Sequence, residues 1–290
     1  MADISKAISA NDIKNGTSIT GVDVTGNVQS YFDTANDRNT PAIADIQNKY
    51  SSRFDDITYY FHHGLSKNLE VYYRLDEESG IRYESVGDKH LTDNNTVGYA
   101  TGVSSKTESG ADFVKANTEY LSLANANLGY LSPGDTDFSI ACWIKLDASD
   151  IASNQHIFGV WNITGNNREY LIWWHAGHTK FRFYTSGNGA TSSSKLITDS
   201  TFSADTWYHL VFVHDATNNQ RQIYVNGTLD NSDSYSDGVY QGNGDFNIGR
   251  TQNTNDRLDG KVDEWGIWSR VLSAEDASDL YNDGNGRKAR

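Results

Sequence analysis

The stretch Gly260-Lys-Val-Asp-Glu-Trp-Gly-Ile-Trp-Ser-Arg-Val-Leu-Ser-Ala-Glu-Asp-Ala-Ser-Asp-Leu-Tyr281 decides the fold class of this chain. Its first nine residues have the composition of a strand, and side chains along a strand alternate between two faces. A short helix follows, because Ser273 and Asp276 have the spacing of a capping box and Gly284 is suited to end the helix. The alternation predicts one strand face with Val262, Glu264, Gly266 and Trp268, and an opposite face with Asp263, Trp265 and Ile267.

The composition of the 290-residue chain favours an all-β domain. The chain is rich in Gly, Asn, Asp, Ser and Thr, has only two prolines, and is 12% aromatic, which is typical of sandwiches with many hairpins. Its formal net charge of −14 disfavours binding to nucleic acid and to anionic membranes. No segment has the character of a membrane span or a signal peptide, so we expect synthesis in a cytoplasm without secretion by the general route.

Eleven segments have the pattern of strands, which predicts a two-sheet antiparallel sandwich. The clearest alternation runs from Phe138 to Leu146 and predicts that Cys142, the single cysteine, is a packed core thiol. Asn226-Gly227 predicts a tight hairpin turn. The predicted strands cover residues 69–75, 111–114, 120–123, 138–146, 156–160, 169–174, 180–184, 207–213, 220–225, 246–248 and 261–268.

A series of motifs follows the same order. They are Tyr73-Arg-Leu-Asp-Glu-Glu-Ser-Gly80, Tyr83-Glu-Ser-Val-Gly87, Phe138-Ser-Ile-Ala-Cys-Trp-Ile144, Asp205-Thr-Trp-Tyr-His-Leu-Val-Phe-Val213, Ile223-Tyr-Val-Asn-Gly227, Phe246-Asn-Ile-Gly249 and Leu258-Asp-Gly-Lys-Val-Asp-Glu-Trp265. In order and spacing, residues 70–284 resemble the laminin-G-like jelly rolls of the concanavalin A-like superfamily. The resemblance implies a jelly-roll sandwich. It does not imply one function, because this fold hosts lectins, hydrolases and scaffolds.

Three regions differ in composition: an N-terminal arm over residues 1–40, a helical linker or stalk over 41–66, and the jelly roll over 67–290. Thr40 and Pro41 suit the start of a helix. Two arrangements stay open for this helix, packing on its own jelly roll or a short coiled coil that forms a trimer. One apolar stripe supports the helix and consists of Ile43, Ile46, Tyr50, Phe54, Ile57 and Phe61.

The arm contains the segment Asp12-Ile-Lys-Asn-Gly-Thr-Ser-Ile-Thr-Gly-Val-Asp-Val-Thr-Gly-Asn27. This segment resembles short motifs of tailed-phage structural proteins, and a flexible, turn-rich leader is an equal alternative. The resemblance implies that the arm anchors the protein to other virion proteins. The side chains expected to anchor it are Ile13, Ile19, Val22 and Val24.

Hydrolase chemistry is disfavoured by the closing strand. A glycosidase needs two carboxylates on either side of the scissile bond. Relatives of the laminarinase type begin their catalytic motif with a glutamate, where this chain has Lys261. Asp263 and Glu264 are neighbours, so alternation predicts that they point to opposite faces. No zinc-binding spacing of histidines and no phosphate-binding loop occurs.

Calcium is the metal that the resemblance implies, as one structural ion where the first and last strands meet. Carboxylate oxygens in acidic loops suit this ion. The matching positions are Asp76, Glu77, Glu84, Asp88 and Asp263. The alternative is that these acids only solvate their loops.

Sugar binding would need exposed aromatic rings for stacking, with polar side chains near them. Trp173 and Trp174 are neighbours on one strand and point to opposite sides, so at most one of them lies in the core. The candidate sugar-binding residues are Trp161, Asn166, Arg168, Trp174 and Tyr184.

These observations together favour a non-enzymatic protein on the surface of a phage virion. It would be a capsid decoration or a tail adhesin whose jelly roll serves adhesion or carbohydrate binding, with host-surface or environmental glycans as partners. The second hypothesis is a carbohydrate-binding lectin module of a secreted bacterial protein. The third is a glycoside hydrolase.

We expect deletion of residues 1–40 to leave a soluble protein with one cooperative thermal transition. The arm has too few apolar side chains to contribute a core. Calorimetry checks the folding, and co-purification with particles checks the anchor, which the deletion should abolish. Normal occupancy on virions would contradict the anchor, and failure to fold would mean that the arm belongs to the jelly-roll core.

Overall fold

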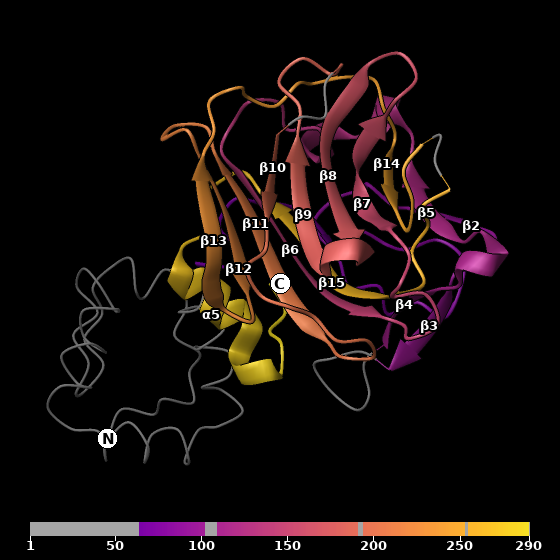
Figure 1. Cartoon of the computed structure of the whole chain (residues 1–290). Helices are drawn as coiled ribbons and strands as arrows, with labels where there is room; N and C mark the ends of the chain where they lie inside the picture. The colour runs from indigo at the N-terminus through magenta and orange to yellow at the C-terminus, as the bar shows by residue number, and fades with distance from the viewer. Residues whose placement is uncertain (1–63, 102–108, 191–193, 253–254, 290) are drawn as a thin grey trace, which may run out of the picture. The chain divides into compact units, whose positions relative to one another are not determined.

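A computed structural model describes residues 64–101, 109–190, 194–252 and 255–289 of the chain. All of the described elements belong to the unit that begins at Leu65. Their strands form two antiparallel sheets that pack face to face, so the predicted all-β jelly-roll sandwich is confirmed (Figure 1). The predicted arm at 1–40 and the helix that begins at residue 41 lie outside the described residues.

One sheet has eight strands and the other has seven. The eight-stranded sheet has the order β13 (Thr228–Ser234), β12 (Gln220–Val225), β11 (Tyr208–Asp215), β6 (Phe138–Leu146), β15 (Gly260–Trp268), β4 (Ser109–Phe113) and β3 (Gly98–Thr101), with β1 (Leu69–Tyr73) also paired to β15. The seven-stranded sheet has the order β10 (Ser194–Ile197), β9 (Lys180–Thr185), β8 (Asn167–His175), β7 (Gln155–Asn162), β14 (Phe246–Ile248), β5 (Tyr120–Leu123) and β2 (Thr92–Asn94). The helices are η1 (Lys115–Asn117), η2 (Asn125–Asn127), η3 (Gly129–Leu131), η4 (Ala176–His178), α5 (Ala274–Tyr281) and η5 (Asn282–Gly284).

All eleven predicted strands form, and β5, β6, β12 and β14 have the predicted bounds. The predicted turn also forms, because Asn226 and Gly227 adopt φ of 49° and 78° between β12 and β13. Four strands were not among the eleven: β2, β3, β10 and β13. The first three are only three or four residues long, and all four carry few apolar side chains, so their alternation is too weak to detect.

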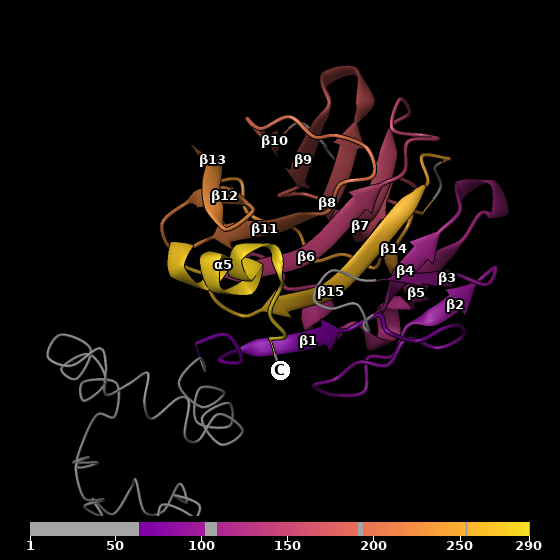
Figure 2. The ribbon, with the colours of Figure 1, turned by 90° about the horizontal axis from the view of Figure 1, so that it is seen from below.

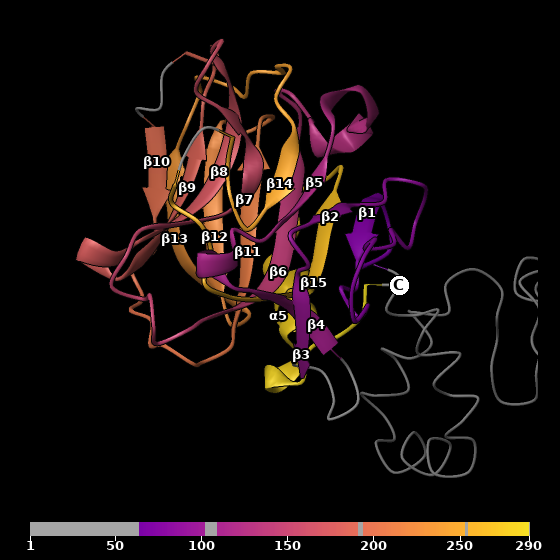
Figure 3. The ribbon, with the colours of Figure 1, turned by 90° about the vertical axis from the view of Figure 1, so that its right-hand side faces the viewer.

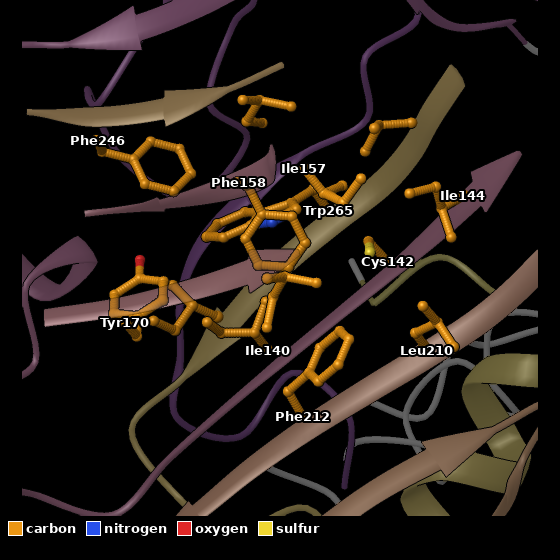
Figure 4. Close-up of a cluster of buried hydrophobic side chains, with 14 of the residues drawn as sticks. Ile140, Cys142, Ile144, Ile157, Phe158, Tyr170, Leu210, Phe212, Phe246 and Trp265 are labelled. Carbon is orange, nitrogen blue, oxygen red and sulfur yellow. The ribbon is translucent and has the colours of Figure 1, made fainter. Parts of the chain in front are cut away.

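The core lies between the sheets and is built from alternate residues of the long strands (Figure 4). Ile140, Cys142 and Ile144 of β6 point into it, opposite Phe158 and Tyr170 of the other sheet. The prediction that Cys142 is a packed core thiol is therefore confirmed, and burial raises the pKa of this thiol.

Helix α5 covers the outer face of the eight-stranded sheet (Figure 2). Ala277 and Leu280 of α5 pack in one cluster with Val211 and Val213 of β11. The predicted capping box starts the helix, with the Asp276 amide donating to Ser273 Oγ at 3.1 Å and the Ser273 amide donating to Asp276 Oδ2 at 2.8 Å. Asn282 ends it in the left-handed region, so the prediction that Gly284 ends the helix is wrong by two residues.

Strand β15 contains a bulge that the predicted alternation misses. Asp263 pairs with Trp143, but Gly266 pairs with Ala141, so β15 uses three residues where β6 uses two. Val262 and Trp265 both lie in the main core although two residues separate them. The predicted division of this strand into two faces is therefore wrong after Asp263, and alternation no longer separates Asp263 from Glu264.

Glu264 occupies the bulge in an unfavourable environment. Its φ is 49°, which is uncommon for a residue other than glycine, and both carboxylate oxygens are buried without a hydrogen-bond partner among the described residues. Burial raises the pKa of Glu264 to about 7, and the charge of Lys288 opposes this rise.

We expect Glu264→Gln to stabilise the fold at about pH 8 and to be nearly neutral at about pH 4. In the unfolded chain the glutamate ionises near pH 4.3, whereas in the fold it resists ionisation until about pH 7. The wild-type fold therefore loses stability as pH rises through this window, by roughly 4 kcal/mol at most. Urea unfolding at both pH values checks this, with the exposed Glu275→Gln as control. A gain that is equal at both pH values would contradict the expectation.

The acidic loop after β1 is closed by backbone amides. Glu84 Oε1 accepts from the amides of Tyr72, at 3.1 Å, and Val86, and Glu84 Oε2 accepts from the amide of Gly87. Glu84 is buried. Its carboxylate therefore joins this loop to β1 as an internal acceptor of three N–H groups.

Glu84→Gln is expected to destabilise the fold by about 2 kcal/mol or more, because the amide group presents donors where backbone donors already point. The matched control is Asp88→Asn, since the side chain of Asp88 is 87% exposed and pairs only with Lys89. We expect this control to leave the stability of the fold essentially unchanged, because solvent screens an exposed ion pair. Thermal melting with calcium and with a chelator measures both variants. Equal losses in the two variants would contradict the acceptor role of Glu84.

Candidate functional site

The outer face of the seven-stranded sheet carries a band of aromatic and basic side chains. Cross-strand pairing places them side by side, because Trp173 pairs with Arg182 and Tyr184 pairs with both Leu171 and Lys195. Helix η4 lies at the end of the β8–β9 hairpin beside them (Figure 1). We call the following set the aromatic-basic face: Trp161, Trp173, His175, Arg182, Tyr184 and Lys195.

The rings of this face contact one another in sequence across the strands. The ring centroid of Tyr184 lies 6.0 Å from that of Trp161 and 5.5 Å from that of Trp173. Trp173 in turn lies 5.5 Å from His175 and 5.6 Å from His156. Trp161 and Tyr184 are 4% and 6% exposed, whereas Trp173 is only partly buried. Trp173 is therefore the indole of this band that a ligand can contact.

Arg182 is the charged group closest to these rings. Its guanidinium carbon lies 5.5 Å from the centroid of the Trp173 ring, and its Nη1 donates to Tyr184 Oη at 3.2 Å. Lys195 Nζ lies 5.8 Å from the centroid of the Tyr184 ring. The face thus combines an aromatic surface with two permanent positive charges.

His175 of the face and His156 beside it both have lowered pKa values. Burial lowers the pKa of His156 to about 4, and His156 Nδ1 lies 2.8 Å from Thr251 Oγ1. Burial, followed by the charges of Arg182 and His178, also lowers the pKa of His175. At neutral pH these imidazoles provide polar ring edges and little charge.

The structure brings three of the five candidate sugar-binding residues to this face. Trp161 and Tyr184 belong to it, and Arg168 pairs with Trp161 in the sheet. The Arg168 guanidinium donates to the carbonyl oxygens of Gly189, at 3.1 Å, and Ala190, at 2.6 Å, so it supports a loop.

The other two candidates lie elsewhere. Asn166 is exposed in the β7–β8 turn with φ of 59°. Trp174 lies in the main core against Phe181 and Phe202, so its selection as a sugar-binding residue was wrong. The physical reason is alternation, because its neighbour Trp173 takes the outward position on β8.

The candidate set left out Trp173 and His175, although both are near its members in the sequence, and sequence reasoning missed Arg182 and Lys195 entirely. A signal for one of them was present in the alternation of β9, where Lys180, Arg182 and Tyr184 are the residues that do not enter the core. Lys195 had no such signal, because β10 was not predicted as a strand. His175 and His178 are only three residues apart in the sequence, whereas His156 reaches Trp173 only through the pairing of β7 with β8.

The five predicted calcium ligands are not arranged as a metal site. In the described ranges, no three His, Cys, Asp or Glu side chains lie together as a group that could hold an ion. Glu77 Oε1 accepts from the Tyr83 amide at 2.8 Å, Asp76 Oδ1 accepts from the Ser109 amide at 3.3 Å, and Asp88 pairs with Lys89. Together with Glu84, these carboxylates serve protein donors, so side chains alone do not fit the ion. Calcium binding itself stays a prediction.

Two further predictions concern the anchoring residues of the N-terminal arm and membrane-spanning segments. The predicted anchoring residues Ile13, Ile19, Val22 and Val24 lie outside the described residues. Of the helices that the structure describes, none has both the length and the apolar character needed to cross a membrane.

Several solved structures have this fold. The binding domain of Paraclostridial Mosquitocidal Protein 1 matches with a TM-score of 0.60 at 16% identity, over 76% of this chain and 53% of that chain. Domain 4 of AbnA, a GH43 extracellular arabinanase from Geobacillus stearothermophilus, was solved in complex with arabinotriose. It matches with a TM-score of 0.55 at 19% identity, over 74% of this chain and 98% of that domain. The ligand binding domain of botulinum neurotoxin serotype D, solved in complex with N-acetylneuraminic acid, matches with a TM-score of 0.53 at 14% identity, over 77% and 52% of the two chains.

These likenesses concern the fold alone, because all three identities are below 20%. The chain spans about half the length of the toxin binding domains that it matches. A search of curated protein sequences found no match. A family model, by contrast, matches residues 115–278, which are more than half of the 290 residues. The resemblance to laminin-G-like jelly rolls is thereby confirmed, and the chain belongs to the concanavalin A-like lectin/glucanases superfamily.

Proposed function

We propose that the jelly roll is a non-catalytic carbohydrate-binding module and that the aromatic-basic face is its binding surface. The observation that carries this proposal is Trp173, a partly exposed indole held among other rings on the outer side of the sheet. Sugar rings have apolar faces that stack on such side chains, and neighbouring polar groups then bind the hydroxyls.

The neighbours by fold agree with this proposal. One of the matching structures is a domain in complex with arabinotriose, and another is a domain in complex with N-acetylneuraminic acid. Both bound molecules are carbohydrates. The match covers 98% of the arabinanase domain, so this fold accepts a sugar in that protein, whereas it covers only 52% of the neurotoxin domain. The surface that binds sugar in this chain is inferred from its own residues.

The closing strand supports a binding role over hydrolysis. Lys261, which stands where relatives of the laminarinase type have their first catalytic glutamate, forms ion pairs with Asp147 at 2.9 Å and with Asp112 at 3.1 Å. The positive charge of Lys261 is therefore neutralised by the carboxylates of Asp112 and Asp147. A lysine in this setting supplies neither of the two carboxylates that glycoside hydrolysis needs.

Display on the surface of a virion is a finer proposal that rests on the leader segment at residues 12–27 alone. That segment lies outside the described residues, and the three similar structures named above are two toxin binding domains and a domain of an arabinanase. The proposed trimer and the proposed anchoring to other virion proteins likewise rest on residues outside the described ranges. A lectin module of a secreted bacterial protein would use the same face, so the two alternatives differ in where the module is displayed.

We expect Trp173→Ala to weaken glycan binding by about 30-fold or more, because a central aromatic anchor contributes about 2 kcal/mol. The measurement is a glycan array with the full chain, followed by calorimetric titration of the saccharides that bind. Trp173→Phe should retain part of the affinity, since the phenyl ring still stacks.

The matched control is Tyr99→Ala. Tyr99 is a 50% exposed aromatic residue on β3 of the other sheet, and its removal should leave binding unchanged. Thermal melting confirms that each variant is folded. The proposal fails if no saccharide binds the wild-type chain, or if Trp173→Ala and Tyr99→Ala bind equally well while folded.

A further inference from the structure

The charge of the aromatic-basic face is opposite in sign to the charge of the whole chain. The chain has a formal net charge of −14. Yet the side chains that β9 and β10 direct outward include Lys180, Arg182 and Lys195, and none of the described outward residues of these two strands is acidic. The outward positions of β9 and β10 thus carry positive charge without a carboxylate, and an acid beside the face, Asp256, pairs with His156 at 3.9 Å. A positively charged surface on an acidic chain indicates a negatively charged ligand.

Arg182 is the strongest single observation. It is 8% exposed, its Nε is buried without a hydrogen-bond partner, and it forms no ion pair with any residue that the structure describes. The other buried arginines of the jelly roll have such partners, since Arg82 lies 4.0 Å from Asp93 and Arg221 lies 2.5 Å from Asp233. A guanidinium withdrawn from water is unfavourable unless an anion compensates it. Arg182 lacks the anion that each of the other two has.

The neighbours of Arg182 make the surroundings more positive. Lys195 is exposed on the adjacent strand β10. Burial is the largest cause of the lowered pKa of His175, and the positive charges of Arg182, His178 and Lys195 lower it further. Trp173 Nε1 is a further buried donor without a partner among the described residues. Donors and positive charge therefore converge at one place, next to the ring of Trp173.

We infer that the aromatic-basic face binds an acidic saccharide, whose carboxylate pairs with Arg182 while the apolar side of a sugar ring stacks on Trp173. This inference rests on the proposed carbohydrate-binding function and adds the charge class of the sugar. A planar carboxylate fits the two-pronged guanidinium, and Lys195 supplies a second, longer-range attraction. A long polyanion such as nucleic acid is disfavoured, because the rest of the chain repels it.

The test uses pairs of saccharides that differ in one charged group. They are 3′-sialyllactose against lactose, and trigalacturonate against its methyl ester, each titrated into the full chain. We expect the acidic member of at least one pair to bind about 10-fold or more tightly than its neutral partner, and salt of about 0.5 M to reduce this ratio. Arg182→Gln should reduce the ratio to within about twofold, and Arg182→Lys should restore part of it.

Two more variants keep the test decisive. Lys195→Gln changes an exposed residue, so it should fold normally and lower the ratio by about threefold. Lys67→Gln removes one exposed charge just before β1, on the other sheet, and should leave the ratio unchanged. Thermal melting checks the folding of every variant.

The outcomes separate the inference from the function that it rests on. If the neutral and acidic members of both pairs bind equally well and Trp173→Ala weakens both, the charge assignment is wrong and the carbohydrate-binding function stands. If the acidic preference survives both Arg182→Gln and Lys195→Gln, the assignment to this face is wrong. If no saccharide binds the wild-type chain, both fail together.

Discussion

The contact of Trp265 with the opposite sheet joins the two halves of the sandwich. Trp265 comes from β15, in the middle of the eight-stranded sheet, and its ring lies 5.0 Å from Phe246 and 5.6 Å from Phe158 of the seven-stranded sheet. A third ring, Tyr73 of β1, lies 5.8 Å away. The bulge at Glu264 is what turns Trp265 inward, so the strained backbone of one residue and the packing of four rings are one structural feature.

The two outer faces of the sandwich differ, and this difference supports the proposed binding surface. On the eight-stranded sheet the outer face is apolar and is covered, with Tyr72 and Trp268 packing in one cluster with Leu280 of α5. On the seven-stranded sheet the outer residues include the aromatic-basic face together with apolar side chains such as Leu171, and the described residues include no long helix above them (Figure 3). Coverage of an apolar face is a requirement of folding, whereas a polar face with an uncovered tryptophan is available for binding.

The sequence alone predicts most of this fold and little of the candidate site. Long strands such as β6 repeat a clear two-residue alternation, so their existence and bounds follow from pattern. The bulge in β15 cannot be seen that way, because one extra residue shifts the facing of every side chain after it. The choice between Trp173 and Trp174 depended on which face of β8 meets the core, and neighbouring strands fix that. Glu84 was predicted as a metal ligand because a loop carboxylate has the same composition whether it meets an ion or three backbone amides.

The mostly buried rings of the candidate site have their own role. Trp161 and Tyr184 are too covered to contact a ligand, but they pack against Trp173 or against each other and so limit the rotamers open to this band. Tyr184 also fixes the Arg182 guanidinium through its hydroxyl group. The stacking surface and the charged group are thus set before a ligand arrives, and little side-chain freedom is lost on binding. Because the same ring positions both groups, a change at Tyr184 would disturb stacking and charge together, whereas changes at Trp173 and Lys195 separate the two contributions.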